Sequence, residues 1–318
     1  MSARGKNRRA FRPGLGGPLE SRLLLATTAG VIQNFNIPPR PGFVGAKTAD
    51  HGRAVAITDV DGELYVVNLL GGGTVRAVPR RGGIVDLVVD GSNGQSELTI
   101  NPFARANPKH TAHNFPLSTA RHDGVLHVGN VTVNSGAIGS VLGYKTAVLS
   151  GVVRVAGTTS VDRVAFQDIV AGGGVVTGGD LNTLDVYHNA AFAGPTSGLN
   201  IGRDLNSFTV KGNLTLSGNA SITVNRDLGL FSQAAKGSGP GGVGISVLGN
   251  VVVNPGSSIR VLRTAAAPLV IQGSLASNPV NDPTTGVPFG DGRISLPNSQ
   301  ATAGTFFVFV AGTYTTAS

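Results

Sequence analysis

The chain has no cysteine, no tryptophan, one methionine and four tyrosines among its 318 residues. The lack of cysteine excludes disulfides, thiolate metal ligands and thiol nucleophiles, so packing and backbone hydrogen bonds must stabilise the fold. Glutamate occurs only at Glu20, Glu63 and Glu97, and charged residues make up 13% of the chain. Helices with a charged outer surface are hard to build from so few charges. No apolar run approaches the roughly 20 residues that span a bilayer as a helix.

Glycine, proline and small β-forming residues are abundant instead. The chain contains 47 glycines and 17 prolines, and 41% of its residues are hydrophobic, which is enough to build a substantial core. Valine and threonine favour strands, while glycine, asparagine and serine favour turns. The composition therefore predicts an all-β protein with many turns.

The net charge of +8 is concentrated at the amino terminus. Six of the lysines and arginines lie within residues 1–22, where Glu20 is the single acidic residue. A nucleic-acid-binding protein needs a contiguous basic face on the folded body, usually with aromatic residues beside it. The charge distribution gives no such face, so we do not expect nucleic acid as a partner.

Similar segments recur along the chain at a nearly constant spacing. Gly178–Val186 (GGDLNTLDV), Gly202–Val210 (GRDLNSFTV) and Asn225–Phe231 (NRDLGLF) place Asp180, Asp204 and Asp227 24 and 23 residues apart. A related form, Gly-Asn followed by alternating apolar residues, occurs at Gly129–Val133, Gly212–Leu216 and Gly249–Val253. A fixed period of this length is typical of repeat architectures, in which each unit stacks on its neighbours.

Each repeat has the alternating apolar pattern of short strands, as in Leu214 and Leu216 or Ile259 and Val261. One unit cannot bury its apolar face alone, but stacked coils share a continuous core. We therefore predict a parallel β-helix, or β-solenoid, with coils of about 23 residues and two or three strands per coil. Residues 123–277 would form about seven coils, a rod about 33 Å long at roughly 4.8 Å per coil.

The remaining segments divide the chain into four parts. Residues 1–45 are a basic export leader and linker, 46–122 an N-terminal β region and loop, 123–277 the solenoid, and 278–318 a C-terminal tail with a terminal strand or hairpin over 304–316. Within the second part, residues 54–70 predict a hairpin that turns at Asp61 and Gly62, and residues 84–100 predict another. We expect this β region to cap the solenoid, because an open sheet edge promotes self-association.

The segment Phe11–Ala26 (FRPGLGGPLESRLLLA) resembles the LExRxLL export signature of large planctomycete surface proteins. Glu20, Arg22, Leu24 and Leu25 carry the match, whereas Gly16 and Gly17 depart from the pattern. A solvated basic arm is the alternative. Together with the GDLN and GNLT copies, the segment resembles glycine- and asparagine-rich β-helical exported proteins of the planctomycete type. That resemblance implies an extracellular or cell-surface location, a structural or adhesive role, and surface polysaccharide, envelope proteins or further copies of the chain as partners.

The stacked aspartates Asp180, Asp204 and Asp227 offer two interpretations. Carboxylates stacked on successive coils could bind calcium, which prefers several oxygen ligands, and would make the protein a calcium-stabilised scaffold. Arg203 and Arg226, however, precede two of these aspartates and could neutralise them. Turn formation and hydrogen bonding between coils is therefore the favoured interpretation.

The strongest enzymatic alternative is a polysaccharide lyase or glycoside hydrolase built on a β-helix. Such sites need paired carboxylates, or calcium with a basic proton acceptor, usually beside aromatic platforms. Asp162, Asp168, Asp185 and Lys211 could be combined into one, but nothing in their spacing singles them out. We therefore expect no enzymatic activity, and assign no catalytic, cofactor-binding or metal-binding residue.

Two further motifs are weak. The histidines fit no compact zinc motif, and we interpret them as polar loop residues: His110, His113, His122 and His127, with His51 and His188 isolated. Gly237, Gly239 and Gly242 have the spacing of a dinucleotide-binding loop, but Pro240 and the lack of a following helix predict a flexible loop that bulges from one coil.

Overall fold

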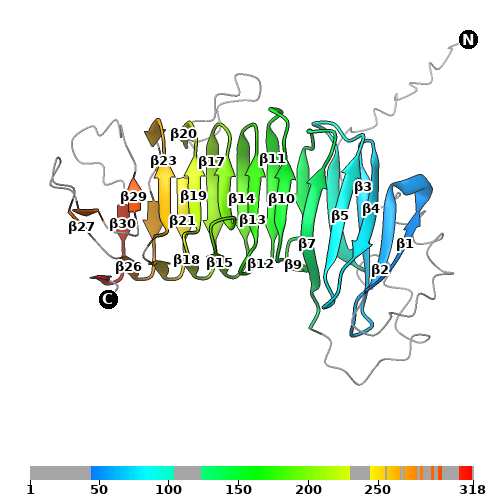
Figure 1. Ribbon diagram of the computed structural model, residues 1–318, viewed down its shortest axis with the longest axis horizontal. Helices are drawn as coiled ribbons and strands as arrows, with labels where there is room; N and C mark the ends of the chain where they lie inside the picture. The colour runs from blue at the N-terminus through cyan, green and yellow to red at the C-terminus, as the bar shows by residue number, and fades with distance from the viewer. Residues whose placement is uncertain are drawn as a thin grey trace, which may run out of the picture.

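The chain forms a β-solenoid whose coils stack in parallel along one axis, and Figure 1 shows this axis horizontally. The computed structural model describes residues 44–103, 123–229 and 244–277, except 255, 266 and 268, together with 280–281, 288–289, 293–295 and 308–316. Equivalent residues of neighbouring coils lie 20 to 24 residues apart where no segment is inserted, as in Asp180 and Asp204. The predicted parallel β-helix is confirmed.

Each complete coil contributes one strand to each of three faces. Face 1 consists of β6 (Glu97–Pro102), β8 (Ser140–Leu142), β11 (Val161–Phe166), β14 (Leu181–Val186), β17 (Leu205–Val210), β21 (Gly244–Val247), β25 (Leu269–Ile271) and β30 (Val308–Val310). The two-residue strands β20 (Asp227–Leu228) and β24 (Thr264–Ala265) lie at its edge.

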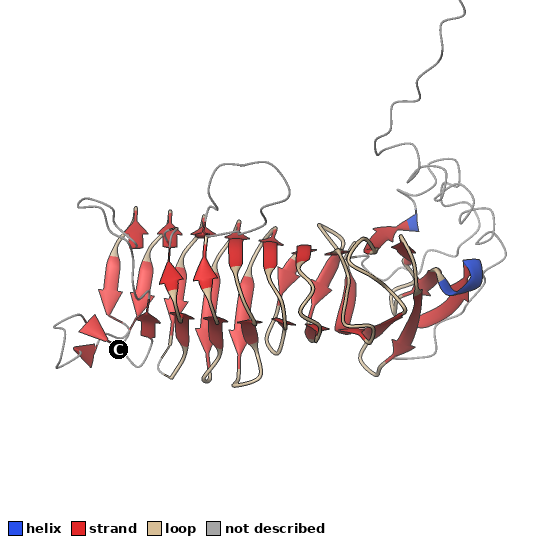
Figure 2. Ribbon diagram, turned by 90° about the horizontal axis from the view of Figure 1, so that it is seen from above, coloured by secondary structure: helices blue, strands red, loops and turns tan. Residues whose placement is uncertain are grey.

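Faces 2 and 3 belong to one continuous sheet, because β7 (Leu126–Val133) is long enough to pair with strands of both. Face 2 contains β9 (Ala147–Leu149), β12 (Asp168–Ile169), β15 (Ala190–Ala193), β18 (Leu214–Ser217), β22 (Val251–Val253), β26 (Leu275–Ser277) and β31 (Tyr314–Thr316). Face 3 contains β10 (Val152–Val155), β13 (Gly174–Thr177), β16 (Gly198–Ile201), β19 (Ser221–Val224), β23 (Ser258–Val261) and β29 (Arg293–Ser295). Seen from above in Figure 2, the coils succeed one another along the rod.

The core is a set of apolar columns that run along the axis. Inward positions of face 1 stay in register from coil to coil, as in Val164, Leu184 and Phe208, which are all fully buried. Face 3 has an equivalent column that includes Leu199 and Ile222. The alternating pattern of the sequence therefore buries every second side chain in a core that no single coil could form.

Antiparallel strands begin the rod at its blue end in Figure 1. They are β1 (Gly45–Ala49), β2 (Ala54–Thr58), β3 (Leu64–Leu70), β4 (Thr74–Pro79) and β5 (Val85–Asp90), with a 3-10 turn at Asp50–Gly52. The sheet order β1-β2-β3-β6 continues in parallel into β8, and β5 continues in parallel into β7. The predicted hairpin over residues 54–70 is present as β2 and β3, with Thr58 opposite Leu64.

The hairpin predicted over residues 84–100 is wrong, and of the two alternatives predicted for the C-terminal segment, strand or hairpin, the strand is observed. Residues 84–100 form β5 and β6, which belong to different sheets, because the turn between them is a corner of the solenoid. In the C-terminal segment, β30 and β31 pair in parallel with β25 and β26 on two different faces, and so extend the coils. A short antiparallel pair, β27 (Val280–Asn281) and β28 (Pro288–Phe289), precedes them. Among the described residues, no helix is long and apolar enough to cross a membrane.

Candidate functional site

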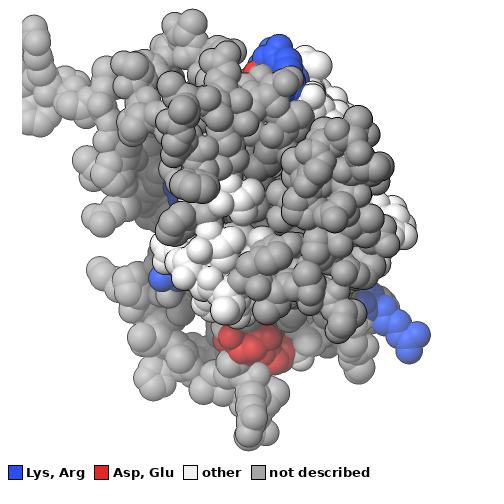
Figure 3. All heavy atoms as spheres, turned by 90° about the vertical axis from the view of Figure 1, so that its left-hand side faces the viewer, with Lys and Arg blue, Asp and Glu red and all other residues white. Residues whose placement is uncertain are grey.

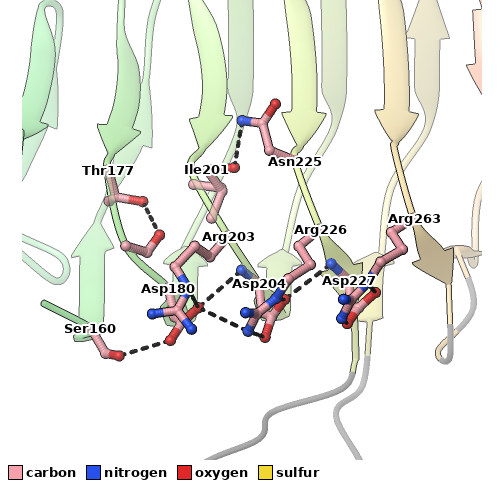
Figure 4. Close-up of polar contacts among 11 residues, drawn as sticks. Ser160, Thr177, Asp180, Ile201, Arg203, Asp204, Asn225, Arg226, Asp227 and Arg263 are labelled. Atoms are coloured by element: carbon pink, nitrogen blue, oxygen red, sulfur yellow. Dashed lines mark hydrogen bonds and ion pairs between the residues drawn. The ribbon is translucent and has the colours of Figure 1, made fainter. Parts of the chain in front are cut away.

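The three repeated aspartates stack at the corner that leads from face 3 into face 1 (Figure 4). Asp180 and Asp204 directly precede face 1 strands, Asp227 is the first residue of β20 on the same face, and all three are nearly fully buried. The backbone N–H of Asp204 donates to Asp180 Oδ1 at 3.1 Å, and the N–H of Asp227 donates to Asp204 Oδ1 at 3.1 Å. The carboxylates of Asp180 and Asp204 therefore hold the backbone at the start of the next coil.

Arginines from the following coil complete this arrangement, which we call the aspartate–arginine ladder (Asp180, Asp204, Asp227, Arg203, Arg226 and Arg263). Arg226 Nε donates to Asp204 Oδ1 at 2.5 Å, and the Arg226 Nη2 group bonds the other oxygen of the same carboxylate. Arg263 makes the same bidentate contact with Asp227, from Nε to one carboxylate oxygen and from Nη2 to the other. Arg203 lies 3.6 Å from Asp180, whose second oxygen accepts a bond from Ser160. Hydrogen bonding to Asp204 raises the pKa of Arg226, so the guanidinium stays charged.

The ladder explains what the repeated aspartates do. Their oxygens accept hydrogen bonds from backbone amides, serine and arginine, so the groups that the calcium hypothesis would use as ligands already have protein partners. Buried carboxylates are tolerated when they are paired and hydrogen-bonded in this way. The geometry therefore supports the favoured interpretation, hydrogen bonding between coils.

A second ladder lies at the corner between faces 1 and 2. Asn189 Oδ1 accepts the N–H of Asn213 at 2.9 Å, and Asn213 Oδ1 accepts the N–H of Asn250 at 2.8 Å. Asn250 bonds Ser274 in the next coil at 2.8 Å. The Gly-Asn copies at 212 and 249 are thus equivalent. The copy at Gly129 is not, because it lies within β7, where Asn130 Oδ1 accepts the N–H of Val152 at the corner between faces 2 and 3.

Four carboxylates gather where the β2–β3 turn meets the start of β7, and we call them the acidic cluster: Asp59, Asp61, Glu63 and Asp123. Each offers an oxygen, and these atoms all lie within 4.8 Å of one another. Tyr65 Oη donates to Glu63 Oε2 at 2.7 Å, and the N–H of Gly124 donates to the same oxygen at 2.9 Å. Sequence analysis missed this cluster because Asp123 is distant along the chain, although the D-x-D-x-E spacing of residues 59–63 was visible.

The electrostatics of the acidic cluster are unfavourable to four separate negative charges. Burial, followed by the hydrogen bond and charge of Asp61, raises the pKa of Asp59 to about 8. Burial and Glu63 likewise raise the pKa of Tyr65. Of the described residues, these four carboxylates form the group that could hold a divalent cation such as calcium.

A third group, which we call the tyrosine patch, lies on the outer surface of face 1 and consists of Tyr144, Lys145, Arg163, Asp185, Tyr187 and Lys211. The rings of Tyr144 and Tyr187 meet edge to face, with centroids 6.1 Å apart. Lys211 Nζ lies 4.3 Å from the Tyr187 centroid, and Lys145 Nζ lies 5.9 Å from it. These distances are those of cation–π contacts.

Arg163 connects the tyrosines with the acidic residues of face 1. Its Cζ lies 5.5 Å from the Tyr144 centroid, and its Nε donates to Asp185 Oδ2 at 2.9 Å. Glu97, which is half-buried, lies in register with the coil that carries Arg163. Burial and the charge of Asp162 raise the pKa of Glu97, and burial raises that of Tyr144.

The four residues of the enzymatic alternative are only partly brought together. Asp185 and Lys211 belong to the tyrosine patch, and Asp162 lies on face 1, where it accepts a bond from Asn182 Nδ2 at 3.0 Å. Asp168 lies on face 2 instead, where it accepts the N–H of Asn189 and lies 3.4 Å from His188.

The histidines do not form a cluster among the described residues. His127 lies 3.6 Å from Asp123, and His51 lies in the 3-10 turn. His110, His113 and His122, the glycines at 237, 239 and 242, and the leader residues 1–43 lie outside the described residues.

No protein-family model matches the chain, and neither a curated protein nor a solved structure shows significant similarity to it.

Proposed function

We propose that the chain is a non-enzymatic, exported structural or adhesive protein of the cell surface. The observation that best supports a structural role is the use of the repeated polar residues. Asp204 and Asn213, the most regular polar positions of the sequence, each bond the coil before and the coil after. The repeat thus serves the integrity of the rod itself.

The proposed location is supported by the amino-terminal sequence and by the composition. The basic leader and its LExRxLL-like segment resemble export signals, and the lack of cysteine makes the fold independent of the redox state outside the cell. The many uncharged threonines and asparagines of the outer faces suit contact with another surface.

Cell fractionation tests this proposal. The chain with a C-terminal epitope tag is expressed in a planctomycete host, and cytoplasm, envelope and medium are separated beside a cytoplasmic marker enzyme. We expect the tag in the envelope or medium, and expect a variant that lacks residues 1–26 to remain with the marker. Full-length protein that co-purifies with the cytoplasmic marker would contradict the proposal.

A carbohydrate-active enzyme is the second candidate, and one observation favours it. Glu97 and Asp162 lie on the same face as the tyrosine patch, and burial, together with the charge of Asp162, raises the pKa of Glu97. Most glycoside hydrolases use two carboxyl groups, one on each side of the scissile bond. Release of reducing ends from a polysaccharide by the purified chain, with loss of release in Glu97→Gln, would support this candidate over a purely adhesive role.

A further inference from the structure

We infer that the tyrosine patch binds an acidic polysaccharide, with the tyrosine rings against the sugar rings and the ammonium groups of Lys145 and Lys211 on sugar carboxylates. This inference rests on the proposed adhesive role and names the ligand class that the role requires. It is based on the arrangement, the backbone conformation and the charge of the patch.

The fold arranges the patch as a row along the rod. Tyr144 follows β8, Tyr187 follows β14 and Lys211 follows β17, so all three lie near the edge of face 1 at which its strands end. Tyr187 lies two coils beyond Tyr144, and Lys211 lies one coil beyond Tyr187, so at about 4.8 Å per coil the row extends over three coil spacings along the axis. A polymer of repeating units can occupy such a row, whereas a small ligand would use only one interval.

Tyr144 has a backbone conformation that tyrosine rarely adopts. Its φ is +37°, in the left-handed region where glycine or asparagine is less strained. The turn is fixed on both sides, because the N–H of Tyr144 donates to Ala165 O at 3.1 Å and Thr146 Oγ1 donates to Ile100 O at 2.9 Å. Tyr144 is half-buried at the outer surface and is not part of the apolar core, so core packing does not explain why a tyrosine occupies this strained position. Strain of this kind is characteristic of residues retained for binding.

Two positively charged side chains of the patch, Lys145 and Lys211, are available to bind an anionic ligand. Asp185 is engaged by Arg163, whereas Lys145 and Lys211 are exposed and form no ion pair within the part of the chain that the structure describes. Both ammonium groups lie beside the Tyr187 ring, so a carboxylate bound there would meet two positive charges next to an apolar surface. Charge-assisted bonds of this type are among the stronger polar contacts.

The acidic residues on the other side of the patch favour a sugar over a nucleic acid. Glu97 and Asp162 lie at the edge where the face 1 strands begin, opposite the lysines. Carboxylates repel phosphates and sugar carboxylates alike, but every sugar unit also carries hydroxyl groups that can donate hydrogen bonds to Glu97 and Asp162, whereas a phosphate backbone offers acceptor oxygens alone. The combination of two lysines, two tyrosines and two carboxylates therefore fits a polymer that carries both hydroxyl and carboxylate groups.

The test is calorimetric titration of the purified full-length chain with polygalacturonate, with dextran and a thymidine oligonucleotide as parallel probes. We expect polygalacturonate to bind and the other two to bind at least about tenfold more weakly. The variant Lys145→Ser/Lys211→Ser should weaken binding by about tenfold or more, and Tyr187→Ala should weaken it while leaving the charge unchanged. The variant Lys145→Arg/Lys211→Arg should retain binding.

A matched control removes two positive charges from another face. Arg154 and Arg260 are exposed on face 3, so Arg154→Ser/Arg260→Ser changes the net charge by the same amount and should bind normally. Equal losses in this control and in the lysine variant would overturn the inference, and so would equal binding of dextran or tighter binding of the oligonucleotide. Melting curves confirm that each variant is folded. Because the titration uses purified protein, its outcome is separate from that of the fractionation experiment.

Discussion

Arg263 binds Asp227 as Arg226 binds Asp204, although the first pair is 36 residues apart and the second is 22. The segment 230–243, which lies outside the described residues, accounts for the longer interval. The arginine–aspartate contact therefore depends on the stacking of the two coils, and it is the same whether 22 or 36 residues separate the partners along the chain. The ladder is therefore a direct measure of whether coils are correctly stacked.

Removal of one carboxylate from the ladder should destabilise the rod. Asp204→Asn replaces a buried charge that holds Arg226, and it points amide hydrogens at a guanidinium. We expect the free energy of unfolding to fall by about 2 kcal/mol, below the usual cost of breaking a fully buried pair because Arg226 is partly exposed. Urea denaturation measures this change.

The matched control for that variant is Asp162→Asn. Asp162 is exposed, and its partner Asn182 still finds an acceptor oxygen in asparagine. We expect a change within about 0.5 kcal/mol. If both substitutions cost the same, the ladder does not contribute to stability as we describe.

Deletion of a whole coil should leave a folded, shorter protein. Loss of residues 204–226 joins Arg203 to Asp227, and Asp227 then takes the place of Asp204 above Asp180. Loss of residues 204–214 alone removes a face 1 strand without its partners on faces 2 and 3, and should unfold the neighbouring coils. Circular dichroism and thermal melting separate these outcomes, and equal unfolding by both deletions would contradict the coil assignment.

Close approach of the backbone between coils makes some glycines irreplaceable. Gly198 has a φ of +125°, and a Cβ atom there would lie 1.9 Å from the carbonyl oxygen of Ser221 in the next coil. Gly194 has a φ of +92° with open space around it, so alanine there meets backbone strain alone. We expect Gly198→Ala to be more destabilising than Gly194→Ala by about 2 kcal/mol or more. Chemical denaturation of the two variants tests this, and similar losses would show that the coils can separate at this corner.

The acidic cluster should make stability depend on pH. The pKa of Asp59 is about 8 in the folded chain and close to 3.8 when unfolded. The folded state therefore binds more protons between these values, and stability should fall as the pH rises from about 4 to 8. Asp59→Asn should flatten this dependence in buffer that contains EDTA. An unchanged pH profile in the variant would show that Asp59 ionises normally.

The sequence predicted the stacking well because the repeat itself encodes it. Asp180, Asp204 and Asp227 are spaced by one coil, and that spacing alone places them in one column. At residues 84–100 the sequence led to a wrong prediction, a hairpin, because a corner of the solenoid and a hairpin turn use the same glycine and asparagine residues. The same ambiguity made Gly129 resemble Gly212, although they lie at different corners.

The tyrosine patch and the acidic cluster could not be derived in this way. Tyr144 and Tyr187 are two coils apart and lie outside the repeated segments, so no periodicity connects them. Asp123 reaches Asp61 only because β7 begins beside the β2–β3 turn. The two tyrosines and the acidic cluster lie outside the repeated segments, and a search for periodicity gives no information on such positions.

The constancy of the ladders across coils of unequal length has a practical consequence. Asn213 and Asn250 are 37 residues apart and Asn189 and Asn213 are 24, yet both pairs form the same bond. The additional residues separate β20 from β21, which both pair with β17, so face 1 accommodates extra sequence at this point without a change of register on either side. A foreign peptide inserted between β20 and β21 would be displayed at a defined position along the axis of the rod, so the solenoid could carry attached peptides at known distances from its ends.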